Sequence, residues 1–168
     1  FPEGDQYHRH IRHHTLGADA ADDPVVFDRL PTPESWPDVA VSPCGEYLLV
    51  EVQVGWSRVD VHLLHLPTNQ WRTVIEGIDA HATFRFHEDR LVGTTTLGAP
   101  GGRIVTVSLA EPGHHHWSTV VPERAGVVME RFAVLGDEII VAASRAAVDV
   151  LERWSFESES LGTIGDLG

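Results

Sequence analysis

Cysteine is almost missing from this chain of 168 residues, because Cys44 is the only one. A single cysteine excludes an internal disulfide and a cage of thiolates around a metal ion. The surrounding letters "SPCGEY" are typical of a turn, and they favour a structural thiol over a nucleophile. A lone thiol suits a reducing compartment, so we expect a cytoplasmic protein.

Long apolar runs are missing as well. The longest uncharged apolar stretches, "YLLV" and "IIVAA", are far shorter than the roughly 20 residues that cross a bilayer. The first residues lack the basic region and the apolar stretch that together mark an export signal. The sequence therefore predicts no membrane segment and no secretory leader.

Basic residues are scarce relative to acidic ones. The chain has 12 Lys and Arg against 25 Asp and Glu, which gives a net charge of -13. Such a charge repels phosphate backbones and removes the electrostatic attraction on which nucleic-acid binding depends. We expect no nucleic acid among the partners.

Short apolar segments that alternate with polar residues recur along the chain, whereas helical periodicity is weak. They form three groups of four, bounded by Gly, Pro, Asp and Asn. The groups are 38–42, 46–54, 58–66 and 70–76; then 82–87, 90–97, 103–110 and 116–122; then 130–135, 138–144, 150–156 and 161–165. Two further strand-like segments, 7–16 and 23–30, precede them and resemble the outer half of such a group.

The groups repeat at a nearly fixed interval. Their second strands begin at Glu46, Arg90 and Glu138, which lie 44 and 48 residues apart. Four strands in a period of about 40 to 50 residues indicate the blade of a β-propeller. We predict an all-β fold, a partial β-propeller with about three and a half four-stranded blades. The expected boundaries are 1–33 for an outer half-blade and 34–78, 79–125 and 126–168 for three blades.

Two similar stretches support the repeat, "NQWRTVI" at 69–75 and "HHWSTVV" at 115–121, 46 positions later. The sequence places Trp71 and Trp117 in the fourth, outermost strand of their blades. A large ring at the same place in successive repeats usually packs against the blade and shields its edge. A ligand-stacking surface is the alternative interpretation.

The chain resembles a known family through the runs "YHRHIRHHTLGADAADDPVVF", "SPCGEYLLVEVQVGWSRVDVHLLHL", "QWRTVIEG", "TTLGAPGGRIVTVSLAEPG" and "HWSTVVPE". These runs resemble the β-propeller of the prolyl oligopeptidase family of serine peptidases, especially its bacterial members. The resemblance covers nearly the whole chain, and residues 158–168 fit least well. In that family a seven-bladed propeller caps an α/β-hydrolase domain that carries a Ser, Asp and His triad.

The resemblance implies a noncatalytic, substrate-gating half of such a propeller. Its expected partners are the α/β-hydrolase domain of the same protein and short peptides that the whole enzyme cleaves. The nucleophile motif G-x-S-x-G is absent, and "GWSRV" at 55–59 lacks the second glycine. We interpret Ser57 as a turn residue, assign no catalytic or substrate-pocket residue, and expect no peptidase activity from this chain alone.

Seven histidines raise the hypothesis of a metal site, because neutral imidazole binds zinc, copper and nickel. They are His8, His10, His13, His14, His114, His115 and His116. If 7–16 is a strand, His8, His10 and His14 share one face with Arg12, whose charge disfavours a cation. A solvated edge strand is the preferred interpretation. The triplet at 114–116 is expected in a loop, where adventitious metal binding and contact with a neighbouring chain are the alternatives.

Other polar clusters have plain interpretations. Six acidic residues fall mainly at turns, where a solvated rim is expected: Glu76, Asp79, Glu88, Asp89, Glu111 and Glu123. The glycine-rich "GAPGG" at 98–102 joins two predicted strands and opens no helix, so we expect a hairpin loop and no phosphate site. The sequence thus predicts no catalytic, cofactor or metal site.

An arc of about three and a half blades cannot close into a ring, so its terminal faces should expose apolar surface. Further blades of a longer protein would cover these faces. In an isolated fragment, a second copy docking head to tail would cover them. A free-standing interaction or assembly module is therefore the alternative function, and an autonomous hydrolase is the least favoured one.

Overall fold

The computed structural model describes residues 7–165, in which all strands belong to four antiparallel sheets. The first sheet contains β1 (Ile11–Arg12) and β2 (Val25–Phe27). The second contains β3 (Trp36–Val41), β4 (Tyr47–Val54), β5 (Arg58–His65) and β6 (Gln70–Ile75). The third contains β7 (Ala82–His87), β8 (Arg90–Thr95), β9 (Arg103–Ser108) and β10 (Ser118–Val121). The fourth contains β11 (Val127–Leu135), β12 (Glu138–Arg145), β13 (Val148–Ser155) and β14 (Ser160–Thr163).

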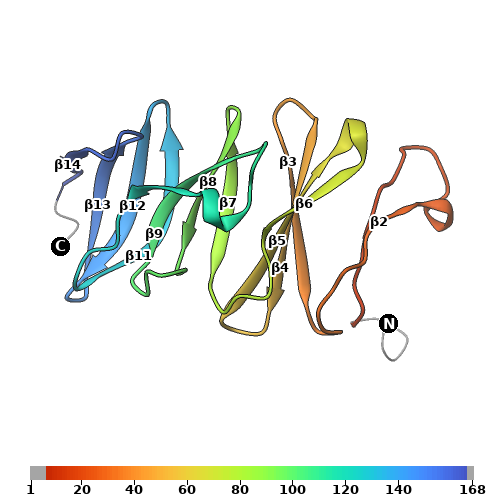
Figure 1. Ribbon diagram of the computed structural model, residues 1–168, viewed down its shortest axis with the longest axis horizontal. Helices are drawn as coiled ribbons and strands as arrows, with labels where there is room; N and C mark the ends of the chain where they lie inside the picture. Colours follow the sequence, from red (N-terminus) through yellow and green to blue (C-terminus); the bar gives the residue numbers. More distant parts are fainter. Residues whose placement is uncertain (1–6, 166–168) are drawn as a thin grey trace.

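Strands that are adjacent in each sheet are also adjacent in the chain, so every four-stranded sheet is an up-and-down meander. The sheets stand side by side in chain order along the long axis of the molecule (Figure 1). The helical elements of residues 7–165 are three single 3-10 turns, η1 (Ala20–Asp22), η2 (Leu66–Thr68) and η3 (His114–His116). The predicted all-β, partial-propeller architecture is confirmed.

The central strands of the second sheet are buried on both faces. Six consecutive residues of β5, from Val59 to Leu64, are buried. Along β4, Leu48, Val50 and Val52 contribute to one apolar cluster and Leu49 to another. Successive residues of a strand point to opposite faces, so this sheet packs against a neighbour on each side.

Three apolar clusters hold the four sheets together. One joins Phe27 of the first sheet to Val50 of the second, and the next joins Val61 to Phe84 of the third. The last joins Ile104 of the third sheet to Val141 of the fourth. Each sheet thus stabilises its neighbours by burying apolar surface, as the blades of a propeller do.

A glycine allows the closest packing within the third sheet. Gly93 on β8 lies directly opposite Phe84 on β7, and the Phe84 ring crosses the space where a side chain would stand. The ring reaches Trp117, whose centroid lies 5.2 Å away in an edge-on arrangement. Trp117 Nε1 donates to the Pro112 carbonyl oxygen at 2.9 Å, which fixes the indole.

The predicted strand over 7–16 is wrong except at its centre. Only Ile11 and Arg12 pair with β2, and His8 has a φ of 57°, which strand geometry does not allow. The predicted shared face of His8, His10, His14 and Arg12 is therefore also wrong. The His13 N–H still donates to the Pro24 carbonyl oxygen at 3.1 Å. Next to it, Arg12 donates to the Asp23 carbonyl oxygen at 2.7 Å and His14 Nδ1 lies 2.9 Å from the Asp23 carboxylate, so side-chain contacts accompany a short ladder here.

Smaller corrections concern strand ends. The strand predicted at 116–122 begins at Ser118, because residues 114–116 form η3 instead of the expected irregular loop. Trp117 therefore precedes its strand, whereas Trp71 lies in β6 as predicted. The Trp71 ring packs 5.3 Å from the Phe27 ring, so both indoles contact the core between sheets.

We expect Gly93→Ala to destabilise the chain by about 1–3 kcal/mol, because overpacking forces the Phe84 ring or the backbone to move. A Cβ at this position would lie 2.5 Å from the Thr83 carbonyl oxygen. Urea unfolding measures the change. Gly113→Ala is the matched control, since Gly113 has a φ of -55° and its nearest neighbour would be 3.9 Å away. Equal stability of the two variants would contradict the packing described here.

Candidate functional site

A carboxylate links the second and third sheets at their inner contact. Glu51 on β4 accepts a hydrogen bond of 2.5 Å from the backbone N–H of Phe84 on β7, which is an edge strand of its sheet. Asp38 on β3 lies directly opposite Glu51, and a small cavity of about 20 Å³ is lined by Asp38, Glu51 and Arg85 together with apolar neighbours. Glu51 thereby satisfies an edge N–H that has no strand partner.

The Glu51 carboxyl titrates in an unusual range. Burial raises the pKa of Glu51 to about 7, and the negative charge of Asp38 adds to this effect. The hydrogen bond from Phe84 and the positive charge of Arg85 oppose it. Protonation of Glu51 near neutral pH would therefore change the charge at the contact between these sheets.

A second polar cluster fixes the connection from β6 to β7. Asp60, which is fully buried on β5, binds Arg58 through both carboxylate oxygens and accepts from the Gly77 N–H at 2.9 Å. Burial alone would raise the pKa of Asp60, but these hydrogen bonds and the charge of Arg58 lower it below its ordinary value. Asp60 therefore stays charged and holds the connection against its own sheet.

A third cluster fixes the connection from β10 to β11. Arg124 Nη1 donates to the buried Glu152 carboxylate at 2.6 Å, and the guanidinium lies 5.3 Å above the Trp154 ring. Burial alone would raise the pKa of Glu152, but hydrogen bonds from Arg124 and Trp154 lower it. In the same connection, Glu123 accepts from the Gly101 N–H at 2.5 Å.

The glycine-rich segment 98–102 packs against the fourth sheet. It joins β8 to β9, as expected of a hairpin loop, and the Gly101 carbonyl oxygen accepts from the Met129 N–H at 2.8 Å. A Cβ on Gly101 would lie 2.8 Å from the Val127 carbonyl oxygen. Glycine is needed here for the close approach of two backbones.

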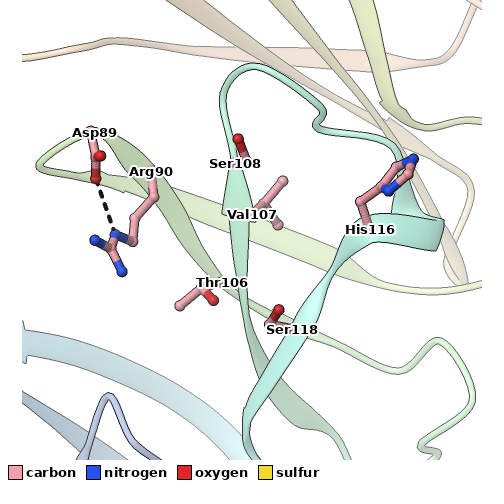
Figure 2. A pocket seen from close by; sticks show the side chains of 7 residues that line it. All are labelled: Asp89, Arg90, Thr106, Val107, Ser108, His116 and Ser118. Atoms are coloured by element: carbon pink, nitrogen blue, oxygen red, sulfur yellow. Dashed lines mark hydrogen bonds and ion pairs between the residues drawn. The ribbon is translucent and has the colours of Figure 1, made fainter.

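The third sheet carries a polar pocket of about 230 Å³ (Figure 2). Its lining consists of Asp89, Arg90, Thr106, Val107, Ser108, His116 and Ser118. Arg90 lies opposite Ser108, and Thr106 lies opposite Ser118, so strand pairing brings these polar side chains together. Arg90 forms an exposed ion pair of 3.2 Å with Asp89, which leaves the pocket without a strong excess of either charge.

The residues singled out in the sequence lie apart from one another. Cys44 is exposed in the turn between β3 and β4, 3.3 Å from the Ser42 hydroxyl, and Ser57 is exposed in the turn between β4 and β5. The hairpin turn at Ser57 is not the strained strand-to-helix turn of a serine nucleophile. The six acidic residues at turns are all exposed, and among them Glu123 bridges two connections and Asp89 pairs with Arg90.

The histidines form local contacts in two separate groups. His10 accepts from Arg12 at 2.9 Å, and the His114 and His115 rings lie 3.8 Å apart. Burial lowers the pKa of His114, and the neighbouring His115 lowers it further. Within residues 7–165, no three His, Cys, Asp or Glu side chains are grouped so that they could hold a metal ion.

Comparison with known proteins identifies the family. Residues 2–166 match the model of the prolyl oligopeptidase N-terminal β-propeller domain. The chain belongs to this family. It is 29% identical over 76 residues to the uncharacterized peptidase y4qF of Sinorhizobium fredii (strain NBRC 101917 / NGR234), a match that covers 45% of this chain and 10% of that protein.

Solved structures show the same arrangement of sheets. A prolyl endopeptidase studied for inter-domain dynamics in catalysis and specificity is 26% identical, with a TM-score of 0.86 over 95% of this chain and 24% of its own. Prolyl oligopeptidase B from Galerina marginata, bound to a 25mer macrocyclization substrate, is 16% identical, with a TM-score of 0.80 over 95% of this chain and 23% of its own. Oligopeptidase B from Trypanosoma brucei is 17% identical, with a TM-score of 0.74 over 90% of this chain and 23% of its own. The chain thus spans about a quarter of the length of the solved structures that it matches.

The buried carboxylates that fix a neighbouring sheet or a connection were not among the residues singled out in the sequence. Their signal is a charge inside an apolar strand, as for Glu51 in "YLLVEVQV", Asp60 in "RVDVHLLH" and Glu152 in "VDVLERWS". A charged residue that is removed from water needs a partner, and these three have one. The residues 7–165 contain no helix long and apolar enough to cross a membrane.

We expect Glu51→Gln to remove a pH-dependent loss of stability. Because the folded-state pKa is raised, the stabilising contribution of Glu51 is complete below its ordinary pKa of 4.5 and is lost as the pH rises through about 7. The variant should gain about 2 kcal/mol relative to wild type between pH 5 and pH 8. Urea unfolding at both pH values measures this difference. Glu46→Gln, in an exposed position just before the same strand, is the control. A Glu51→Gln advantage that does not change with pH would contradict the assignment.

Proposed function

We propose that this chain is the noncatalytic, substrate-gating propeller part of a prolyl oligopeptidase-like serine peptidase. The observation that carries the proposal is the family match over 2–166, in a chain that covers 24% of the prolyl endopeptidase structure. Its partner would be the α/β-hydrolase domain of the same protein, which would supply the catalytic triad. Its blades would be 34–78, 79–125 and 126–168, preceded by a half-blade at 1–33.

The uncovered face of the fourth sheet supports a longer propeller. Val128 and Leu135 are 55% and 71% exposed. Ile140 lies between the buried Ile139 and Val141 on β12, so its side chain points to the opposite, uncovered face. A sheet with apolar residues on both faces requires a neighbour on each. Further blades of the same protein would supply it.

Gating would follow from sterics. A closed propeller over an active site admits short, flexible peptides and excludes folded proteins, whose diameter exceeds the opening. Glu51, which joins two sheets, and the pairs Arg58–Asp60 and Arg124–Glu152, which fix the connections, would keep the propeller rigid. A cytoplasmic location is part of the proposal and is supported by Cys44, a free and exposed thiol.

The proposed function is tested in the longer enzyme with one proline-containing sequence presented as a short peptide and within a folded carrier protein. We expect cleavage of the short peptide only. Leu135→Asp should loosen the propeller and raise cleavage of the carrier relative to the peptide, because it places a charge in a sheet contact. Trp36→Ala, at an exposed aromatic position, is the control. Unchanged selectivity in a loosened Leu135→Asp enzyme would contradict gating, as would peptidase activity of the 168-residue chain alone.

A free-standing assembly module is the second candidate, and the same exposed apolar face favours it. In isolation the fourth sheet of one copy would pack against the first sheet of another, giving a head-to-tail homo-oligomer.

We expect light scattering on the pure chain to give a mass above 18.5 kDa that falls on dilution. Leu135→Asp should restore the monomer, because it charges the proposed contact. Val41→Asp is the control, since Val41 is 58% exposed on a different sheet. A wild-type monomer at all concentrations would refute self-association.

A further inference from the structure

Trp56 stands fully in solvent at the tip of the hairpin between β4 and β5. The side chain is 96% exposed, although tryptophan is a large, mostly apolar residue that folded chains generally cover. We define the Trp56 corner as the hairpin 55–58 together with the connection 76–81. The two segments lie side by side, because the Val59 N–H donates to the Ala80 carbonyl oxygen at 3.1 Å.

Side-chain hydrogen bonds hold the backbone of the hairpin that carries the indole. The Gln53 side chain donates to the Gly55 carbonyl oxygen at 2.8 Å and to the Arg58 carbonyl oxygen at 3.3 Å. His81 Nε2 donates to the Trp56 carbonyl oxygen at 2.7 Å. The ring is thus presented on a hairpin that is already ordered, which reduces the entropic cost of binding.

The corner is negatively charged. It contains the carboxylates of Glu76 and Asp79 against the guanidinium of Arg58, and the carboxylate of Asp60 on the adjoining β5 pairs with that guanidinium, so the four groups together carry a net charge of -2. The hydrogen bond with Asp60, followed by the charges of Asp60, Glu76 and Asp79, raises the pKa of Arg58, so these groups lie close enough to interact. Arg58 is bound to Asp60, whereas Glu76 and Asp79 are exposed.

Three of the other four tryptophans of the chain lie against an arginine. Arg9 lies 4.0 Å above Trp36, Arg29 lies 5.5 Å from Trp71, and Arg124 lies 5.3 Å from Trp154. A guanidinium over an aromatic face is a favourable cation–π contact. Among the described residues no arginine lies over Trp56, and its surroundings carry the charge that would attract one.

We propose that the Trp56 corner binds an arginine or lysine side chain of a basic partner segment, with the cation over the indole and its charge next to Glu76 and Asp79. The net charge of -13 would speed the approach of such a segment. This interaction goes beyond the proposed gating function, since it requires neither the catalytic domain nor a closed propeller.

The test uses the 168-residue chain and a short acetylated peptide with two arginines, followed by NMR of the five indole N–H signals. We expect the Trp56 signal to shift saturably. The same peptide with citrulline, which keeps the shape and lacks the charge, should leave the signal in place. Calorimetric titration with the arginine peptide gives the affinity of the variants, including Trp56→Ala, which lacks the Trp56 signal. Trp56→Ala, and separately Glu76→Gln with Asp79→Asn, should each weaken binding about fivefold.

Trp36→Ala is the matched control, because Trp36 is 59% exposed but already lies against Arg9. We expect it to leave the affinity unchanged. Equal shifts with the arginine and citrulline peptides, or an affinity unaffected by Trp56→Ala, would overturn the proposal. So would shifts spread evenly over all the indoles, which would indicate a general attraction to the acidic chain.

Discussion

The structure depends on the burial of apolar surface between successive flat sheets. Each of the three contacts is built from β-branched and aromatic side chains that are almost wholly removed from water, such as Val50, Val61 and Ile139. A four-stranded sheet alone would leave these faces in solvent. The fold is therefore a stack in which each sheet is stable because of its neighbours.

Buried polar groups add specific hydrogen bonds and ion pairs to this stack of sheets. The Glu51 carboxylate, the Arg58–Asp60 pair and the Arg124–Glu152 pair each tie a segment of one sheet to another element, at positions that apolar packing has partly removed from water. Hydrogen bonds in such surroundings are strong, and a lost partner leaves a costly unpaired group. Glu51 helps to position two sheets and the two ion pairs position connections, whereas the apolar contacts supply most of the stability.

The repeat period, the β-branched segments and the turns were enough to predict the fold, and the positions of β4, β8 and β12 follow the predicted interval. The segment 7–16 was mispredicted because alternation of polar residues does not show how far a strand pairs with its neighbour; here the pairing is two residues long, and side-chain contacts of Arg12 and His14 with Asp23 lie beside it. The sequence pattern does not show which distant group a buried charge binds. Glu51 binds the Phe84 N–H, 33 positions later, and this contact depends on how the sheets stack. The exposure of Trp56 was likewise hidden, because a tryptophan in a turn gives no sign of whether its ring folds back.

The central proposal is that a further blade of a longer protein, or a second copy of the chain, covers the outer face of the fourth sheet. Hydrogen–deuterium exchange of the 168-residue chain, at a concentration where it is monomeric, and of the longer enzyme tests it most directly, since amide protection reports local opening. We expect β4 and β5 to be equally protected in both proteins and β12 and β13 to be markedly more protected in the longer enzyme. Equal protection of β12 and β13 in the two proteins would contradict the account.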